Sequence, residues 1–219
     1  MYARSSATAA LALEDGRIFR GEPFGAQVEV GGEVVFTTTM TGYQEVATDP
    51  SFNGQIVTFT YPLIGNYGVT PEDDESWQPW AKGIVVREYG DEPSHWRLTG
   101  TFDDYLKRHN IPGIKGVDTR ALTRHLRDQG LLRGVLIPDR RGMSDEELVA
   151  RARKAALPSE YNVVAETSIP QIETTGNPDG KHVVVLDCGH KRNIVRSLER
   201  RGLKVTVVPW DTPYETVAA

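Results

Sequence analysis

The feature that most restricts the fold of this chain is a strand–helix–strand pattern near its carboxyl end. Residues 182–188 and 204–210 are short apolar runs rich in valine, and residues 193–201 between them place apolar side chains at helical spacing. This order predicts a βαβ unit with two parallel strands. Because parallel sheets normally have more strands and are covered on both faces, we expect the opening of a second α/β domain whose remainder the sequence lacks.

The segment before this unit mixes strands and helices in a different order. Strands are predicted at residues 8–13, 33–38, 55–60, 83–87 and 131–137, with a hairpin at Asp15-Gly16. Helices are predicted at residues 101–109, 120–129 and 144–156, with caps from Thr101, from Asp118 or Thr119, and from Ser144. Residues 157–181 carry three prolines and two glycines without sustained periodicity, and we interpret them as a linker. The expected domains are therefore 1–156 and 182–219.

Composition and charge argue against several classes of function. Thirty acidic and 25 basic residues give a net charge of -5, which disfavours a nucleic-acid partner. No run approaches the roughly 20 apolar residues that a membrane span needs, and the weakly apolar patch in residues 1–16 is too short for a secretory leader. The single cysteine, Cys188, cannot form an internal disulfide, so we expect a cytoplasmic protein.

Cys188 lies in the sequence L-D-C-G-H-K-R-N, at the turn between the predicted strand and helix near the carboxyl end. Free N–H groups at the start of a helix lower the pKa of a thiol, so a catalytic nucleophile is one interpretation. The other is a small apolar residue, which is the usual role of a lone cysteine. A nucleophile also needs a base within hydrogen-bond reach, and the local sequence does not decide between the two.

Two charged segments and the histidines complete the set of candidate sites. Arg120, Arg124 and Arg127 predict a basic helix face, for which solvation and contact with a partner are the alternatives. The acidic run from Glu72 to Glu75 has the same two interpretations, a solvated loop or an interface. The five histidines and the cysteine show no metal-ligand spacing, and no Walker-type phosphate loop is present, so we predict neither a metal nor a cofactor site.

Three longer blocks, taken in order, closely resemble one protein family. They are G-E-V-V-F-T-T-T-M-T-G-Y-Q-E-V-A-T-D-P-S (32–51), Y-L-K-R-H-N-I-P-G-I-K-G-V-D-T-R-A-L-T-R-H-L-R-D-Q-G (105–130) and D-C-G-H-K-R-N-I-V-R-S-L (187–198). Taken alone, T-D-P-S is ordinary turn chemistry. Together the blocks resemble the small, glutamine-hydrolysing subunit of carbamoyl-phosphate synthetase.

The resemblance implies an α/β fold with two parts. The first is the small subunit's N-terminal β/β/α domain, which binds a large subunit, and the second is the first βαβ of a flavodoxin-like class I glutamine amidotransferase domain. In the complete enzyme, a heterodimer, ammonia from glutamine passes through a tunnel to the large subunit. That subunit makes carbamoyl phosphate from bicarbonate and ATP, for arginine and pyrimidine biosynthesis. It would hold the ATP and Mg²⁺, and this chain would hold no cofactor.

The resemblance carries one site residue onto this chain. Ser51, in the T-D-P-S turn, matches the family's glutamine-contacting serine. The family's catalytic cysteine, histidine and glutamate fall beyond Ala219, so we assign no catalytic residue and expect this chain alone to be inactive. Two alternatives remain open: a non-catalytic interaction or scaffold module that binds the large subunit, and an independent hydrolase with Cys188 as its nucleophile.

Overall fold

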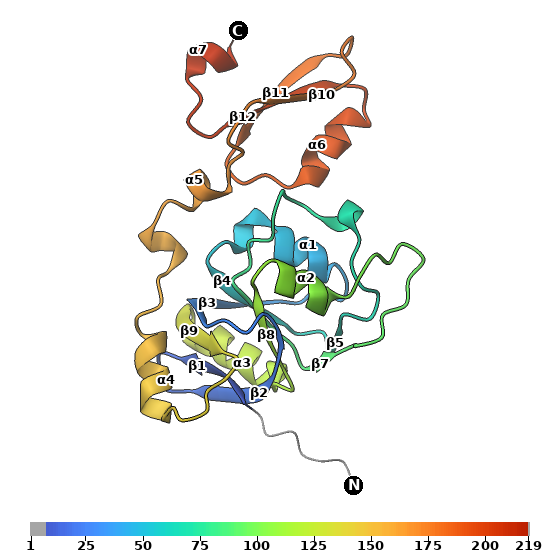
Figure 1. Cartoon of the computed structure of the whole chain (residues 1–219). Helices are drawn as coiled ribbons and strands as arrows, with labels where there is room; N and C mark the ends of the chain where they lie inside the picture. The colour runs from blue at the N-terminus through green and yellow to red at the C-terminus, as the bar shows by residue number, and fades with distance from the viewer. Residues whose placement is uncertain (1–7, 219) are drawn as a thin grey trace.

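A closed β-barrel forms the larger part of the molecule (Figure 1). The computed structural model describes residues 8–218, so the first seven residues of the patch considered as a leader lie outside it. The barrel strands follow the order β1-β2-β8-β6-β4-β3-β9. Their bounds are β1 (Ala9–Leu13), β2 (Ile18–Gly25), β3 (Val30–Thr37), β4 (Gln55–Phe59), β6 (Gly83–Val85), β8 (Pro112–Lys115) and β9 (Leu132–Ile137).

The barrel combines a hairpin with a run of parallel strands. The Asp15-Gly16 hairpin is confirmed, because β1 and β2 pair antiparallel with Ala12 opposite Ile18. The β3–β4, β4–β6 and β6–β8 pairs are parallel, and β9 closes the barrel between β3 and β1. A small two-stranded ladder of β5 (Leu63–Ile64) and β7 (Glu88–Tyr89) lies beside it. Parallel neighbours need long connections, and these carry the helices.

The barrel helices begin where the sequence predicts caps. The hydroxyl of Thr101 accepts the amide N–H of residue 104 at the start of α2 (Phe102–Arg108), and Ser144 completes a capping box for α4 (Asp145–Ala152). The carboxylate of Asp118 caps α3 (Thr119–Gln129). These predictions are confirmed, although α4 ends four residues before the predicted limit. The short helix α1 (Tyr43–Thr48) was not predicted, because six residues carry too little periodicity.

Apolar side chains fill the barrel and the space beneath α3. Leu122 of α3 is fully buried in one cluster with residues from several barrel strands. Those strand residues include Leu11, Ile56, Val85, Ile114 and Leu136, all fully buried. The barrel interior is therefore a packed apolar core, and polar functional groups lie on the loops between its strands.

The carboxyl-terminal unit is a three-stranded sheet with one helix on one face (Figure 1). We call this sheet, with the order β10-β12-β11, the second sheet. Strands β11 (His182–Asp187) and β12 (Lys204–Pro209) pair parallel, with α6 (Arg192–Glu199) between them in the chain. Val195 of α6 packs on Val205 and Val207 of β12. The predicted βαβ unit is therefore confirmed. The short helix α7 (Tyr214–Val217) follows β12.

The segment expected to be a linker contains structure of its own. Residues 157–181 include the 3₁₀ turn η3 (Pro158–Glu160), helix α5 (Val163–Thr167) and strand β10 (Glu173–Gly176). Strand β10 pairs antiparallel with β12 as an edge of the second sheet, so the linker interpretation is wrong for this part of the segment. Its sequence, E-T-T-G, has no apolar alternation, and its pairing partner lies about 30 residues away in the chain.

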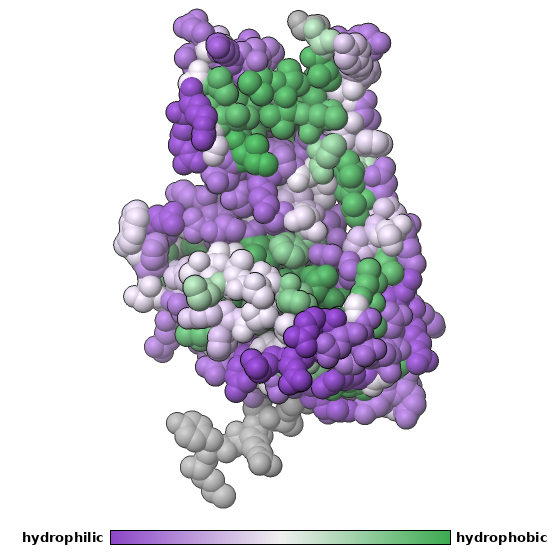
Figure 2. Space-filling model, turned by 180° about the vertical axis from the view of Figure 1, so that it is seen from behind, coloured by the Kyte–Doolittle hydropathy of each residue, from purple (hydrophilic) through white to green (hydrophobic). Residues whose placement is uncertain are grey.

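The face of this sheet opposite α6 is apolar and open to solvent. Side chains alternate along a strand, so Val184 and Leu186 point away from the face on which Val185 packs toward α6. Leu186 is 47% exposed, and Figure 2 shows apolar side chains gathered over this part of the molecule. Among residues 8–218, β11 pairs with β12 alone, which leaves its other edge free.

Candidate functional site

The T-D-P-S turn and the turn that contains Cys188 meet at the junction between the barrel and the second sheet. The Lys191 Nζ lies 2.8 Å from Asp49 Oδ2, joining the β11–α6 turn to the T-D-P-S turn. The backbone of Gly189 lies so close to the first turn that a Cβ there would be 3.2 Å from Pro50 Cβ. Residues far apart in the chain therefore form one continuous surface at this junction.

Ser51 lies on the exposed side of this junction. Asp49 precedes the 3₁₀ turn η1 (Pro50–Phe52), and its Oδ1 accepts hydrogen bonds from the Ser51 amide at 3.0 Å and the Ser51 hydroxyl at 2.7 Å. Because the hydroxyl hydrogen points to Asp49, the lone pairs of Ser51 Oγ are left to accept from an incoming N–H group. The predicted site residue is thus accessible and oriented as an acceptor.

The buried carboxylate of Asp187 organises the turn that contains Cys188. Its Oδ1 accepts the amides of Gly189 and His190, at 2.9 and 2.8 Å, and lies 2.7 Å from His190 Nδ1. Its Oδ2 accepts the amide of Ile169 at 2.7 Å. Burial would raise the pKa of Asp187, but the hydrogen bonds from the His190 side chain, from the His190 amide and from the Ile169 amide outweigh it and lower the pKa to about 2.

Helix α6 takes its amino-terminal cap from the barrel. Lys191, at the cap position, contributes no side-chain hydrogen bond to the helix. Instead, the Glu75 carbonyl accepts the Arg192 amide at 2.7 Å, and the Glu75 carboxylate accepts the Asn193 amide at 3.0 Å. The Glu75 amide in turn donates to Thr48 Oγ1 at the end of α1. The acidic run therefore includes a contact between the two parts of this chain, one of the two interpretations that its sequence allowed.

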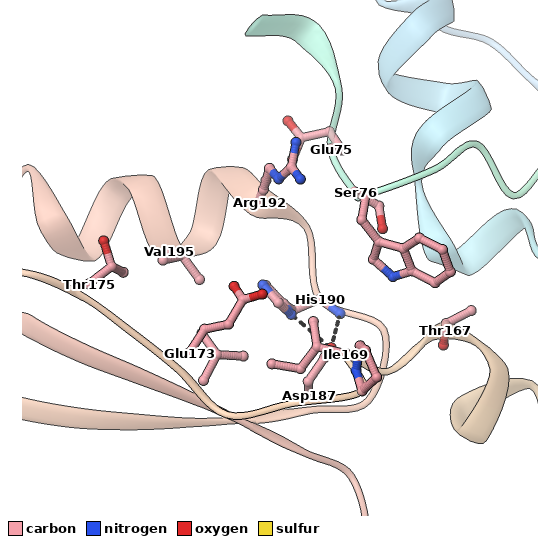
Figure 3. A pocket seen from close by; sticks show the side chains of 13 residues that line it. Glu75, Ser76, Thr167, Ile169, Glu173, Thr175, Asp187, His190, Arg192 and Val195 are labelled. Atoms are coloured by element: carbon pink, nitrogen blue, oxygen red, sulfur yellow. Dashed lines mark hydrogen bonds and ion pairs between the residues drawn. The ribbon is translucent and has the colours of Figure 1, made fainter. Parts of the chain in front are cut away.

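A cavity of about 330 Å³ opens between Glu75 and the second sheet (Figure 3). The barrel loop forms one wall, and α6 with the start of β10 forms the other, and polar His190 and Arg192 line it together with apolar Val195. Ser51 and Cys188 do not line it. The cavity is thus separate from the predicted glutamine contact.

Cys188 lies where the sequence predicted, between the end of β11 and the start of α6, and its side chain is exposed. The nearby His190 is engaged with Asp187 through Nδ1, and the described part of the chain provides no hydrogen bond to the thiol. Within residues 8–218, no three histidine, cysteine, aspartate or glutamate side chains gather where they could hold a metal ion. None of the helices described is long and apolar enough to span a bilayer.

The sequence named Ser51, by resemblance, and the Cys188 turn, and it left Glu75 between a solvated loop and an interface, but it gave no sign that Asp49 and Lys191 join the two turns. Asp49, Lys191 and Glu75 act through tertiary contacts, and a charged residue in a turn carries no mark of its distant partner. The available signal for Asp187 was a carboxylate at the end of a valine-rich strand, two residues before a glycine, a pattern that also fits an ordinary turn.

The hydrogen bonds of Asp187 make the stability of the fold depend on pH. An aspartate whose pKa is lower in the folded chain than its unfolded value of about 3.9 stabilises the fold above that pH, and the contribution is lost as the pH falls toward 2. We expect Asp187→Asn to lower the free energy of unfolding by about 2–4 kcal/mol at pH 7. Its deficit relative to the unaltered chain should shrink between pH 4 and pH 2.

Urea unfolding at several pH values measures both effects. Asp179→Asn is the matched control, because Asp179 is exposed and its side chain makes no hydrogen bond within the described residues. A deficit for Asp187→Asn that stays constant down to pH 2 would contradict the assigned role.

The close approach of Gly189 to α5 and to the T-D-P-S turn gives a second test. Gly189 has φ +93°, and a Cβ would lie 2.9 Å from Thr167 Oγ1. Gly202 has φ +75°, but a Cβ there meets nothing within 4 Å. Both alanine variants carry the strain of a positive φ, so the excess cost of Gly189→Ala, expected at about 1–3 kcal/mol in urea unfolding, reports the contact itself. Equal losses of unfolding free energy for the two variants would show that the atoms around Gly189 shift at no cost.

Comparison with known proteins places these features in a family. The family model described as carbamoyl-phosphate synthase small chain, CPSase domain, matches residues 11–136. The carbamoyl phosphate synthase small chain of Syntrophotalea carbinolica is 49% identical over 96% of this chain. Those of Methanopyrus kandleri and Fusobacterium nucleatum are each 50% identical, over 95% and 94% of it.

The alignments cover only part of each relative. The chain spans 59%, 58% and 56% of the lengths of these three small chains. On the side of this chain the match extends over nearly the whole length, so it is not confined to the barrel. The resemblance seen in the three sequence blocks is confirmed. This chain belongs to the family of carbamoyl-phosphate synthase small chains.

Proposed function

We propose that this chain is the amino-terminal part of a glutamine-hydrolysing small subunit, which supplies ammonia to a large subunit that makes carbamoyl phosphate from bicarbonate and ATP. The observation that carries the proposal is the junction at which Lys191 pairs with Asp49, beside the exposed Ser51. It fixes a polar acceptor from the barrel against the first turn of the second sheet. A substrate held by a glutaminase domain built on that sheet would meet Ser51 there.

The chemistry of Ser51 suits glutamine. The free lone pairs of its Oγ can accept a hydrogen bond from an ammonium or carboxamide N–H, and glutamine carries both groups. The hydroxyl is held by a carboxylate that is itself paired with Lys191, so its orientation is set before a substrate arrives. Such preorganisation lowers the entropic cost of binding.

The open face of the second sheet supports a larger glutaminase domain. Parallel sheets are normally covered on both faces, whereas the face that carries Leu186 and the free edge of β11 are uncovered among the described residues. In this proposal further strands of a flavodoxin-like domain pair with β11, and further helices cover the apolar face. The domains would then divide near residues 156 and 182, with β10 as an added edge strand. The catalytic cysteine, histidine and glutamate would come from the added part.

The remaining roles follow from the same proposal. The barrel domain binds the large subunit, which holds ATP and Mg²⁺, and the assembly works in the cytoplasm in arginine or pyrimidine biosynthesis. In this chain the groups at the junction bind and orient the substrate, and thiolate chemistry belongs to the added part.

The chain as it stands should not hydrolyse glutamine. Cys188 has no hydrogen-bonded base within the described residues, and thioester formation needs a thiolate next to a base. We expect no ammonia above background from purified chain and glutamine in a coupled dehydrogenase assay. Cys188→Ala serves as the control. Ammonia release that disappears in Cys188→Ala would instead support an independent hydrolase.

A longer protein tests the role of Ser51. Residues 1–219 can be continued into the carboxyl-terminal part of the Methanopyrus kandleri small chain and assembled with a large chain. Loss of one hydrogen bond to a charged substrate group costs about 1.5–3 kcal/mol, so Ser51→Ala should raise the KM for glutamine roughly 10- to 100-fold. Synthesis from free ammonia should be unchanged.

The exposed Ser94, whose hydroxyl makes no hydrogen bond within residues 8–218, gives the control Ser94→Ala. An unchanged glutamine KM in Ser51→Ala would remove Ser51 from the substrate site. Assembly with the large chain but no glutamine-dependent synthesis in the unaltered chimera would favour the scaffold alternative.

A further inference from the structure

A basic groove runs along α3, away from the junction with the second sheet. It has a volume of about 510 Å³ and lies between the helix and the residues that follow β3 and β4. Its lining consists of three arginines and three threonines: Arg120, Arg124, Arg127, Thr38, Thr60 and Thr123. None of the carboxylates among residues 8–218 lines it, although the net charge of the chain is -5.

The arginines of this groove are largely uncommitted. Arg120, Arg124 and Arg127 follow one another at helical spacing and share one face of α3. Arg120 and Arg124 are exposed and make no side-chain hydrogen bond or ion pair with residues 8–218. Within the same range Arg127 pairs only with its neighbour Asp128, at 3.0 Å, and both side chains are more than half exposed. Like charges on one helix face repel each other, so an anionic partner would relieve a cost that the free chain carries.

Exposed apolar side chains adjoin the lining residues of the groove in the chain. Phe36 and Met40 flank Thr38 in the sequence, Tyr61 follows Thr60, and all three side chains are exposed, Met40 to 70%. Arginine, methionine and aromatic residues are enriched where proteins bind each other. The Thr123 hydroxyl is buried without a hydrogen-bond partner in the described part of the chain, which leaves a polar atom at the groove unsatisfied. These features favour a protein segment over a small free anion.

We propose that this groove binds a carboxylate-rich segment of the carbamoyl-phosphate synthase large chain. The inference rests on the proposed function for the identity of the partner, and on the three guanidinium groups for the chemistry. Guanidinium groups bind carboxylates through paired N–H donors, which fixes orientation as well as attraction. The exposed Phe36, Met40 and Tyr61 then pack against the apolar surface that flanks the acidic segment.

The test measures the Kd of the 219-residue chain for a purified large chain, in low salt and in high salt. The double variant Arg120→Glu/Arg124→Glu should raise the Kd at least about tenfold in low salt, with a weaker dependence on salt. Lys154→Glu/Lys181→Glu changes the net charge equally at two exposed lysines that make no side-chain hydrogen bond or ion pair with residues 8–218, and it should change the Kd less than about twofold. Circular dichroism and urea unfolding verify that both variants fold.

A second probe separates the groove from the identity of the partner. A fluorescein-labelled oligoglutamate peptide should bind the unaltered chain and the lysine variant, and bind the arginine variant at least about tenfold more weakly. Arg120→Lys/Arg124→Lys keeps the charge but loses the paired donors, so it should give an intermediate Kd and covers the case in which charge reversal prevents folding.

The outcomes distinguish the two proposals. If the large chain binds the arginine and lysine variants equally, the groove proposal is overturned while the proposed function stands. If the unaltered chain fails to bind the large chain but binds the peptide through its arginines, the partner assigned under the proposed function is wrong and carboxylate recognition stands. If neither the large chain nor the peptide distinguishes the variants, the groove is ordinary solvated helix surface.

Discussion

The interaction on which the rest of the junction depends is the set of hydrogen bonds to Asp187. One carboxylate closes the turn after β11 and also holds Ile169, which leads into β10. The turn so formed directs Lys191 toward Asp49 and starts α6 against Glu75. A buried charge is costly unless fully paired, and four N–H groups, from three backbone amides and one imidazole, pair this one. The position of α6 on the barrel therefore depends on one buried side chain.

The barrel and the second sheet hold each other by polar contacts more than by apolar burial. The Glu75 cap of α6, the Lys191–Asp49 pair, and the Asn53 amide that donates to Glu166 at 2.8 Å each join a residue of the barrel part to one beyond residue 156. Backbone groups at a helix start must find partners, and a cap from another part of the chain makes folding of the helix depend on its position. The apolar surface of the second sheet lies elsewhere, on its open face.

Much of the architecture could be predicted from local sequence, because its signals are local. Capping residues such as Thr101 and Ser144 mark helix starts, and the valine runs of β11 and β12 mark strands. Strand β10 could not be predicted, since four polar residues become a strand only when β12 supplies partners. Closure of the barrel was also beyond the sequence, because it depends on β9 pairing with both β1 and β3.

The candidate site also has a part that local sequence predicts and a part that it does not. Ser51 came from resemblance, and its turn from the preference of Asp49 for bonding to the backbone two residues on, but the meeting of this turn with the Cys188 turn joins residues far apart in the chain.

The antiparallel strand β10 leaves one side on which the parallel strands of the second sheet can be extended. It closes the outer side of β12 with residues that precede the βαβ unit, while β11 keeps its unpaired side among the described residues. Because β12 is paired on both sides, an added strand, whether from the same polypeptide or from a neighbouring molecule, can extend the parallel part of the sheet only beside β11. The same strand forms late during synthesis, because β10 must wait until the ribosome has delivered β12.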